Sequence, residues 1–248
     1  MDKLLITASG VLGSTFHLTI SLLAVCLSIQ AAAGSERSDG IRELVERASQ
    51  PEVMFGNPAA FDSLMNMLAS GGENSVRELL DLAGTPWAWQ FEVIRRSLER
   101  IGEPAREVIL ERLAGGGLED GESSRLLVLF EKLGQVGDES ALAVYLRGES
   151  RAVTVPALRC LAAFSEPERS ILLVQPLLAS PDSHLRLAAV WAIGEFSRRG
   201  KPAKVKAERL SAAVRPLLDD PVLQIRLTAA ETLHALGSAP APSLIPGH

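Results

Sequence analysis

Residues capable of acid–base or metal chemistry are thinly scattered along this chain. Beyond position 33 the histidines are His184, His234 and His248, which lack a Cys, Asp or His partner at metal-ligand spacing. Carboxylates are frequent but interleaved with arginines in segments such as REVILER at 106–112, a pattern typical of solvated helix faces with ion pairs three or four residues apart. We therefore predict no catalytic residue, no metal site and no cofactor, and we expect a protein that is not an enzyme.

Two other segments resemble reactive motifs without their essential residues. The run Gly115-Gly116-Gly117 is followed by Leu and acidic residues, not by the Lys-Ser/Thr of a phosphate-binding loop, so we interpret it as a linker between repeats. Cys160 lies in ALRCLAA, a helix-like segment that favours a small buried core residue over a reactive thiol. Because Cys26 lies in an N-terminal apolar run that we expect to be removed, no internal disulfide is expected.

Three of the few aromatic residues fall within five positions, at Trp87, Trp89 and Phe91. On a helix Trp87 and Phe91 share a face, because they are four residues apart, whereas Trp89 points elsewhere. Such side chains either pack between repeats or form an exposed anchor for a partner. Trp87 and Trp89 are therefore the candidate partner-binding residues.

Composition and charge exclude several functional classes. The chain has 30 acidic and 25 Lys or Arg residues, and without a basic face it is not expected to bind nucleic acid. Five basic residues do fall between positions 198 and 206, and they predict a solvated loop or a contact with an anionic surface. Aromatic residues make up only 4% of the chain, which favours helices over a β-sandwich.

The elements that would position these residues are predicted to be helices throughout. Leucines and alanines recur at intervals of three and four, while Gly and Pro fall between the periodic segments. The predicted helices span residues 40–50, 58–69, 74–83, 87–101, 104–114, 122–135, 139–147, 151–164, 167–179, 182–198, 203–218 and 222–236.

The helix predicted after Asp182 is apolar on more than one side. Its main stripe consists of Leu185, Ala189, Ala192, Ile193 and Phe196. Leu187, Val190 and Trp191 lie off that stripe. A helix that packs against both its own partner and a neighbouring repeat requires this pattern.

An internal repeat is clearest near the C-terminus. VQPLLASPDSHLRLAAVWAIG from Val174 matches VRPLLDDPVLQIRLTAAETLH from Val214 without a gap, at an offset of 40 residues. Ser180 and Asp220 each precede the shared proline, where we expect a side-chain oxygen to cap the following helix. The segment from Leu142 matches the Val174 unit at an offset of 32. Each unit is therefore predicted to be a helix, a tight turn and a second helix.

These repeated segments resemble the HEAT-repeat family, including the short HEAT-like repeats of phycobilisome lyases. The resemblance is carried by Gly102-Glu103-Pro104-Ala105 and by Asp220-Pro221 followed by Ile225-Arg226; it covers residues 87–237 and, more faintly, 58–84. It implies an all-α superhelix with a concave and a convex face. Two departures are Thr154, which stands where later units have Arg186 and Arg226, and His234, which stands in place of Gly194.

The first 33 residues are predicted to be a secretory signal peptide. The apolar run LTISLLAVCLSI at 18–29 is followed by Ala31-Ala32-Ala33-Gly34, which predicts cleavage between Ala33 and Gly34. Two alternatives stay open: an uncleaved anchor, if the apolar run extends back to Val11, and a lipoprotein site at Cys26. The rest is divided into a linker and N-terminal cap (34–57), the solenoid (58–237) and a disordered tail (238–248).

The resulting functional hypothesis is an exported, non-enzymatic scaffold that binds a protein or peptide. One alternative is a membrane-anchored adaptor with the same solenoid, so contact with a membrane is expected only if the N-terminal segment is retained. A second alternative, implied by the family resemblance, is a lyase or chaperone for tetrapyrroles. The sequence makes no prediction about oligomeric state.

Overall fold

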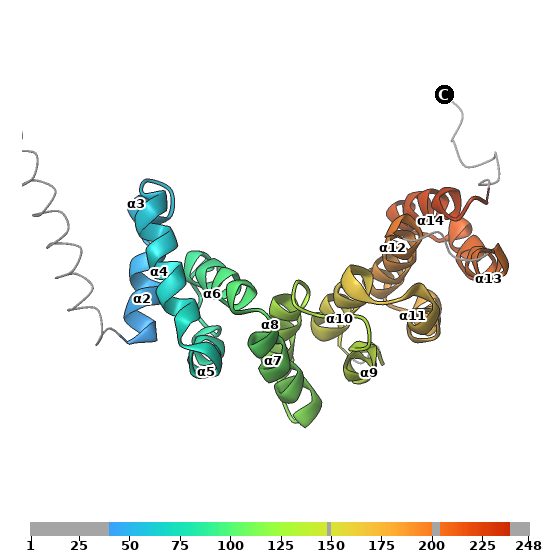
Figure 1. The fold of residues 1–248 in the computed structure, drawn as a ribbon. Coiled ribbons are helices and arrows are strands. Elements are labelled where there is room, and N and C mark those ends of the chain that lie inside the picture. The colour runs from blue at the N-terminus through green and yellow to red at the C-terminus, as the bar shows by residue number, and fades with distance from the viewer. Residues whose placement is uncertain (1–39, 148–149, 200–203, 239–248) are drawn as a thin grey trace, which may run out of the picture.

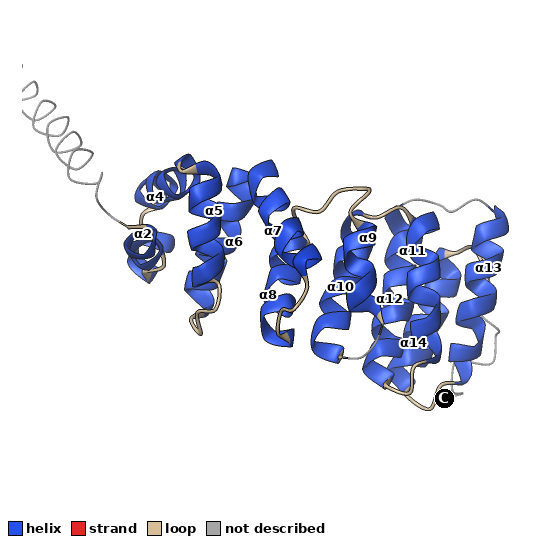
Figure 2. Cartoon of the chain, turned by 90° about the horizontal axis from the view of Figure 1, so that it is seen from below, coloured by secondary structure: helices blue, strands red, loops and turns tan. Residues whose placement is uncertain are grey.

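The computed structural model describes residues 40–147, 150–199 and 204–238, and within these ranges the protein consists of helices and loops without a strand. The helices form an open arc (Figure 1) and are stacked side by side along it (Figure 2). The signal-peptide prediction, with Cys26, Ala33 and Gly34, lies outside the described residues, as do His248 and the tail beyond Ser238. No described helix is long and apolar enough to cross a membrane.

The helices alternate between the two sides of the arc. Two N-terminal helices, α2 (Ile41–Ala48) and α3 (Pro51–Met54), pack against α4. The concave side is formed by α4 (Pro58–Ser70), α6 (Ala88–Ile101), α8 (Asp120–Phe130), α10 (Arg151–Phe164), α12 (Ser183–Arg199) and α14 (Leu223–Ala235). The convex side is formed by α5 (Gly72–Leu82), α7 (Glu103–Gly115), α9 (Glu139–Leu142), α11 (Pro167–Val174) and α13 (Lys204–Val214). Three 3₁₀ segments follow the last three of these: η2 (Ala143–Leu146), η3 (Gln175–Ala179) and η4 (Arg215–Asp219).

Each predicted helical segment contains a helix, so the all-α superhelix is confirmed. The short α3 was not predicted. In three predicted helices the last turn is 3₁₀. In two of them this turn begins near Pro176 or Pro216, which has no N–H to donate to a carbonyl four residues back. Helix α8 ends at Phe130, five residues earlier than expected. Just beyond it the chain passes Phe164 so closely that a Cβ on Gly134 would lie 2.1 Å from that ring.

The core is a continuous layer between the concave and convex helices. The predicted stripe of α12 is buried in full, and Val190 is buried as well, because α12 packs on both α10 and α14. Cys160 is also buried, as predicted, and its thiol donates a hydrogen bond to the Leu127 carbonyl at 3.0 Å. Phe130 and Phe164 meet edge-to-face between α8 and α10, with ring centroids 5.5 Å apart. This packing holds the C-terminal concave helices in one register.

Two Arg–Asp pairs tie successive repeats together. Arg186 donates through Nε and Nη2 to the two carboxylate oxygens of Asp220, at 2.7 and 3.1 Å, and Arg106 pairs with Asp138 in the same bidentate way. Both aspartates are buried, and each also accepts a hydrogen bond from a nearby backbone N–H. Bidentate, charge-assisted hydrogen bonds are stronger than neutral ones, and removal of either partner would leave the other charge without compensation in a partly buried site.

The predicted capping role of Ser180 and Asp220 is wrong. The prolines that follow them lie in bends, and the next helices begin only at Ser183 and Leu223. Ser180 accepts a hydrogen bond from the Asp182 N–H, and Asp220 accepts one from the Val222 N–H, so each side chain closes the turn before the helix. In Asp220 the carboxylate is engaged mainly by Arg186 of the preceding repeat.

Candidate functional site

The side chains that could carry chemistry stay apart in the folded chain. Among the described residues no three His, Cys, Asp or Glu side chains lie close enough together to hold a metal ion. His184 and His234 are exposed on different helices. Burial raises the pKa of the Cys160 thiol far above its usual range, so the thiolate is strongly disfavoured.

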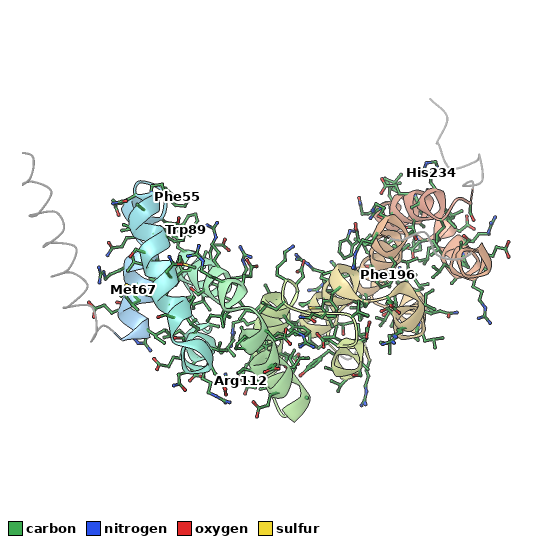
Figure 3. All side chains as sticks on the ribbon, in the orientation of Figure 1. Phe55, Met67, Trp89, Arg112, Phe196 and His234 are labelled. Carbon is green, nitrogen blue, oxygen red and sulfur yellow. The ribbon has the colours of Figure 1, made fainter. Side chains whose placement is uncertain are left out.

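The two candidate tryptophans are exposed but do not share a surface. Trp87 is 68% exposed and precedes α6, which begins at Ala88; it lines a shallow depression with Arg42 and Asp81. Trp89 is 51% exposed and meets Phe55 edge-to-face, with ring centroids 5.2 Å apart (Figure 3). Their role in partner binding stays a prediction, although their exposure is what an anchor requires.

A more spacious concave site than the depression beside Trp87 lies on the inner side of the C-terminal helices. We call it the C-terminal groove: it has a volume of about 930 Å³ and crosses α10, α12 and α14. It is lined by Ser150, Arg151, Ala152, Val155, Pro156, Arg159, His184, Leu187, Ala188, Trp191, Gln224 and Thr228. Helix α12 is flanked by α10 and α14 and contacts α11 and η3 on its outer side, so its inner side is the one left exposed.

The groove is built from equivalent positions of three successive repeats. The two offsets seen in the sequence, 32 and 40 residues, bring together Val155, Leu187 and Leu227 in one row. The other rows are Ala152, His184 and Gln224; Pro156, Ala188 and Thr228; and Arg159, Trp191 and Glu231. Every member of these rows on α10 and α12 lines the groove, and on α14 Gln224 and Thr228 do. The surface is therefore a direct consequence of the repeat, as in other solenoids.

The floor of the groove is apolar, with Trp191 on α12, the middle one of its three helices. Trp191 remains 36% exposed, although its neighbour Val190 is fully buried. Pro156 lies inside α10 and has no N–H to donate to the carbonyl of Ala152, four residues back. Ala152 is itself exposed and lines the groove.

All the ionisable side chains that line the groove belong to Arg or His. Arg151 donates to Nδ1 of His184 at 3.0 Å, and no carboxylate of the described chain lies within ion-pairing distance of it. Arg159 pairs with Glu131 at 3.0 Å. The pKa of Asp182, behind His184, is lowered by a hydrogen bond from the His184 backbone N–H and, more weakly, by the charges of His184 and Arg151. The groove is thus a locally positive surface on a protein of net charge −5.

Sequence reasoning missed this groove, although its signal was present. Leu187 and Trp191 were both expected to pack against the neighbouring repeat; Leu187 is only half-buried and Trp191 is exposed. The positions off the buried stripes, compared at the same two offsets, form the rows that line the groove. Of the basic cluster at 198–206, the structure describes the side chains of Arg198 and Arg199, and neither lines the groove: Arg198 pairs with Glu195, and Arg199 donates to the Ala162 carbonyl.

Comparisons with known proteins agree with this architecture. No protein-family model and no curated protein matches the chain. Among solved structures, a designed armadillo repeat protein in complex with the peptide (KR)4 matches with a TM-score of 0.51 and 16% identity, covering 80% of this chain and 100% of that one. A second designed armadillo repeat protein matches with a TM-score of 0.47 and 16% identity, covering 79% and 100% of the two chains. An engineered protein matches with a TM-score of 0.44 and 16% identity, covering 81% and 98%.

Proposed function

We propose that this chain, an α-solenoid of the armadillo and HEAT type, is a non-enzymatic scaffold that binds a segment of a partner protein in the C-terminal groove. The observation that carries the proposal is the alignment of equivalent positions from three repeats into one apolar groove around Trp191. Exposed tryptophans in concave, apolar surroundings are typical centres of binding energy. A purely structural face would bury or replace such a residue.

The similar designed protein supports a peptide segment as the kind of ligand. Its structure contains the peptide (KR)4, which indicates that a stacked-helix fold of this type can hold a peptide. Since function resides in surface residues and not in the fold, the groove described above must supply the specificity. An extended chain crossing three helices would contact each repeat in turn.

We also propose that the scaffold acts outside the cytoplasm, on the strength of the sequence alone. The apolar run at 18–29 followed by Ala33-Gly34 supports a cleaved signal. Intact mass of the protein from its native host tests this proposal. A mass lacking residues 1–33 supports cleavage, whereas a full-length mass in the membrane fraction would favour the anchored adaptor.

The binding proposal is tested by crosslinked capture with matched variants. A C-terminally tagged full chain is compared with Trp191→Ala and Trp89→Ala, two exposed tryptophans in different halves of the arc. We expect the partners that crosslink to the parent protein to be lost from Trp191→Ala and kept by Trp89→Ala, with both variants retaining the parent circular dichroism. The reverse result would move the site to the Phe55–Trp89 pair, and retention by both variants would contradict both sites.

A further inference from the structure

We infer that the C-terminal groove binds an acidic segment that carries a bulky apolar side chain, with its carboxylates over α10 and its polar end over α14. This inference rests on the proposed function and adds the chemistry of the ligand. It concerns the same residues but a different property of them, namely charge, so the two ideas can fail separately.

The first argument is the charge of the lining. Arg151, Arg159 and His184 are the ionisable residues of the groove, and the lining contains no carboxylate. The chain as a whole is acidic, with a formal net charge of −5. A positive groove on a negative protein attracts acidic segments and repels basic ones over distances up to a Debye length.

The second argument is that one arginine is already oriented and is in no ion pair within the described chain. Arg151 contacts His184 at 3.0 Å, and its charge acts on Asp182 only at longer range than an ion pair. A guanidinium offers five N–H donors in a planar fork, so a carboxylate of a ligand can bind to Arg151 without breaking an ion pair of the described residues. Arg159, by contrast, already pairs with Glu131, and a ligand would share it.

The third argument is the polarity across the three helices. One row of equivalent positions changes from Arg159 on α10 to Trp191 on α12 and Glu231 on α14. The α14 side contributes Gln224 and Thr228 to the lining and no basic residue. Charge complementarity therefore places acidic residues of the ligand over α10, an apolar side chain against Trp191 and Leu187, and polar residues over α14.

The spacing of the three helices sets the length of the bound segment. Packed helices are about 8–10 Å apart, so three of them span about 20 Å. An extended chain advances about 3.3 Å per residue, so about six residues cross the groove.

The test is a selection of short random peptides displayed on phage, with the full chain as bait. Clones that also bind Trp191→Ala are removed first, so the remaining sequences depend on the groove. We expect Asp and Glu to be enriched in these sequences beside one Leu, Phe or Trp, and Lys and Arg to be depleted. Representative peptides are then synthesised with a fluorophore and titrated with the parent protein and its variants.

Charge is isolated with Arg151→Gln, for which the matched control is Arg215→Gln, an exposed arginine of η4 outside the groove. We expect Arg151→Gln to weaken acidic peptides by about 2- to 5-fold, in line with exposed ion pairs. Analogues of the same peptides with Gln in place of their acids should bind the parent and Arg151→Gln equally, and Arg215→Gln should change neither.

Three other outcomes separate the two ideas. Groove-dependent peptides that are basic or uncharged, or that are insensitive to Arg151→Gln, would keep the proposed function and overturn the acidic ligand. Selection that yields no peptide dependent on Trp191 would overturn the proposed function together with this inference. Equal loss of the acidic peptides and their Gln analogues in Arg151→Gln would show that the arginine acts by shape, which also contradicts the inference.

Discussion

The N-terminal and C-terminal halves of the arc use the same stacked helices but expose different surfaces. On α6 the partly exposed charges neutralise one another: Arg95 pairs with Glu92 and Glu99, and Arg96 also pairs with Glu92. Arg100 reaches across to Asp62 of α4 at 3.2 Å. On α10 and α12 the equivalent layer holds an apolar groove and an arginine without a carboxylate partner among the described residues. A surface whose charges are already paired leaves few charged groups to bind a ligand.

The halves also differ in how their concave helices meet. From α8 onward each concave helix packs broadly on the next, and α4 packs on α6, but α6 and α8 barely touch. The two halves are joined mainly through α7, just before the glycine run at 115–117. In solenoids stability is the sum of local units and their interfaces, so we expect the two halves to unfold separately at this weak interface.

The largest expected effect is a destabilisation of the C-terminal half that leaves the stability of the N-terminal half unchanged. Phe130→Ala removes a fully buried ring at the start of the C-terminal half, and we expect a loss of about 3–5 kcal/mol in the free energy of unfolding of that half. The three tryptophans report on the halves separately, since Trp87 and Trp89 lie in one and Trp191 in the other.

Fluorescence of the Trp191→Phe variant follows the N-terminal half during denaturation in urea, and the Trp87→Phe/Trp89→Phe variant follows the C-terminal half. Phe130→Ala should lower the midpoint only when Trp191 is the reporter. A single transition that shifts equally for all reporters would show that the halves unfold as one unit.

A smaller effect distinguishes the two Arg–Asp pairs. Asp220→Asn leaves Arg186 partly buried without its carboxylate, and we expect a loss of about 2–4 kcal/mol confined to α13 and α14. Asp138→Asn breaks the equivalent pair with Arg106 at the junction of the halves and should loosen α7 and α9. Hydrogen exchange measured peptide by peptide locates each change; protection lost throughout the chain in either variant would contradict local stabilisation.

Helix positions could be predicted from the sequence because each helix buries one stripe of apolar residues. In α12, as elsewhere, these residues recur every three or four positions, and this period can be seen directly in the sequence. The groove could not be predicted in the same way. Whether Leu187 or Trp191 is covered depends on how far α10 and α14 approach the inner side of α12, which is a property of the stack. The repeat offsets identify which positions are equivalent, and so identify the rows. Which rows are exposed could be assigned only from the packed structure. The ion pair of Asp220 could not be predicted for the same reason, because its partner Arg186 is 34 residues away.

The smallest expected effect concerns pH and sharpens the contrast between the surfaces. A hydrogen bond from Arg95, and a further one from Arg96, lower the pKa of Glu92 to about 2 from an unfolded value near 4.5. Because the folded pKa is depressed, the carboxylate stabilises the N-terminal half above about pH 4.5, and this contribution is lost as pH falls toward 2.

Since the side chains are partly exposed, we expect Glu92→Gln to cost only about 1 kcal/mol at neutral pH. We also expect it to flatten the acid limb of the curve of stability against pH when Trp87 and Trp89 are the reporters. The C-terminal half has its own lowered carboxyl pKa at Asp220, caused by Arg186, so its acid limb should persist in Glu92→Gln when Trp191 is the reporter. If Glu92→Gln left the acid limb of the N-terminal half unchanged, the α6 charges would not be stabilising that surface, and the contrast between a paired and an open face would rest on the groove alone.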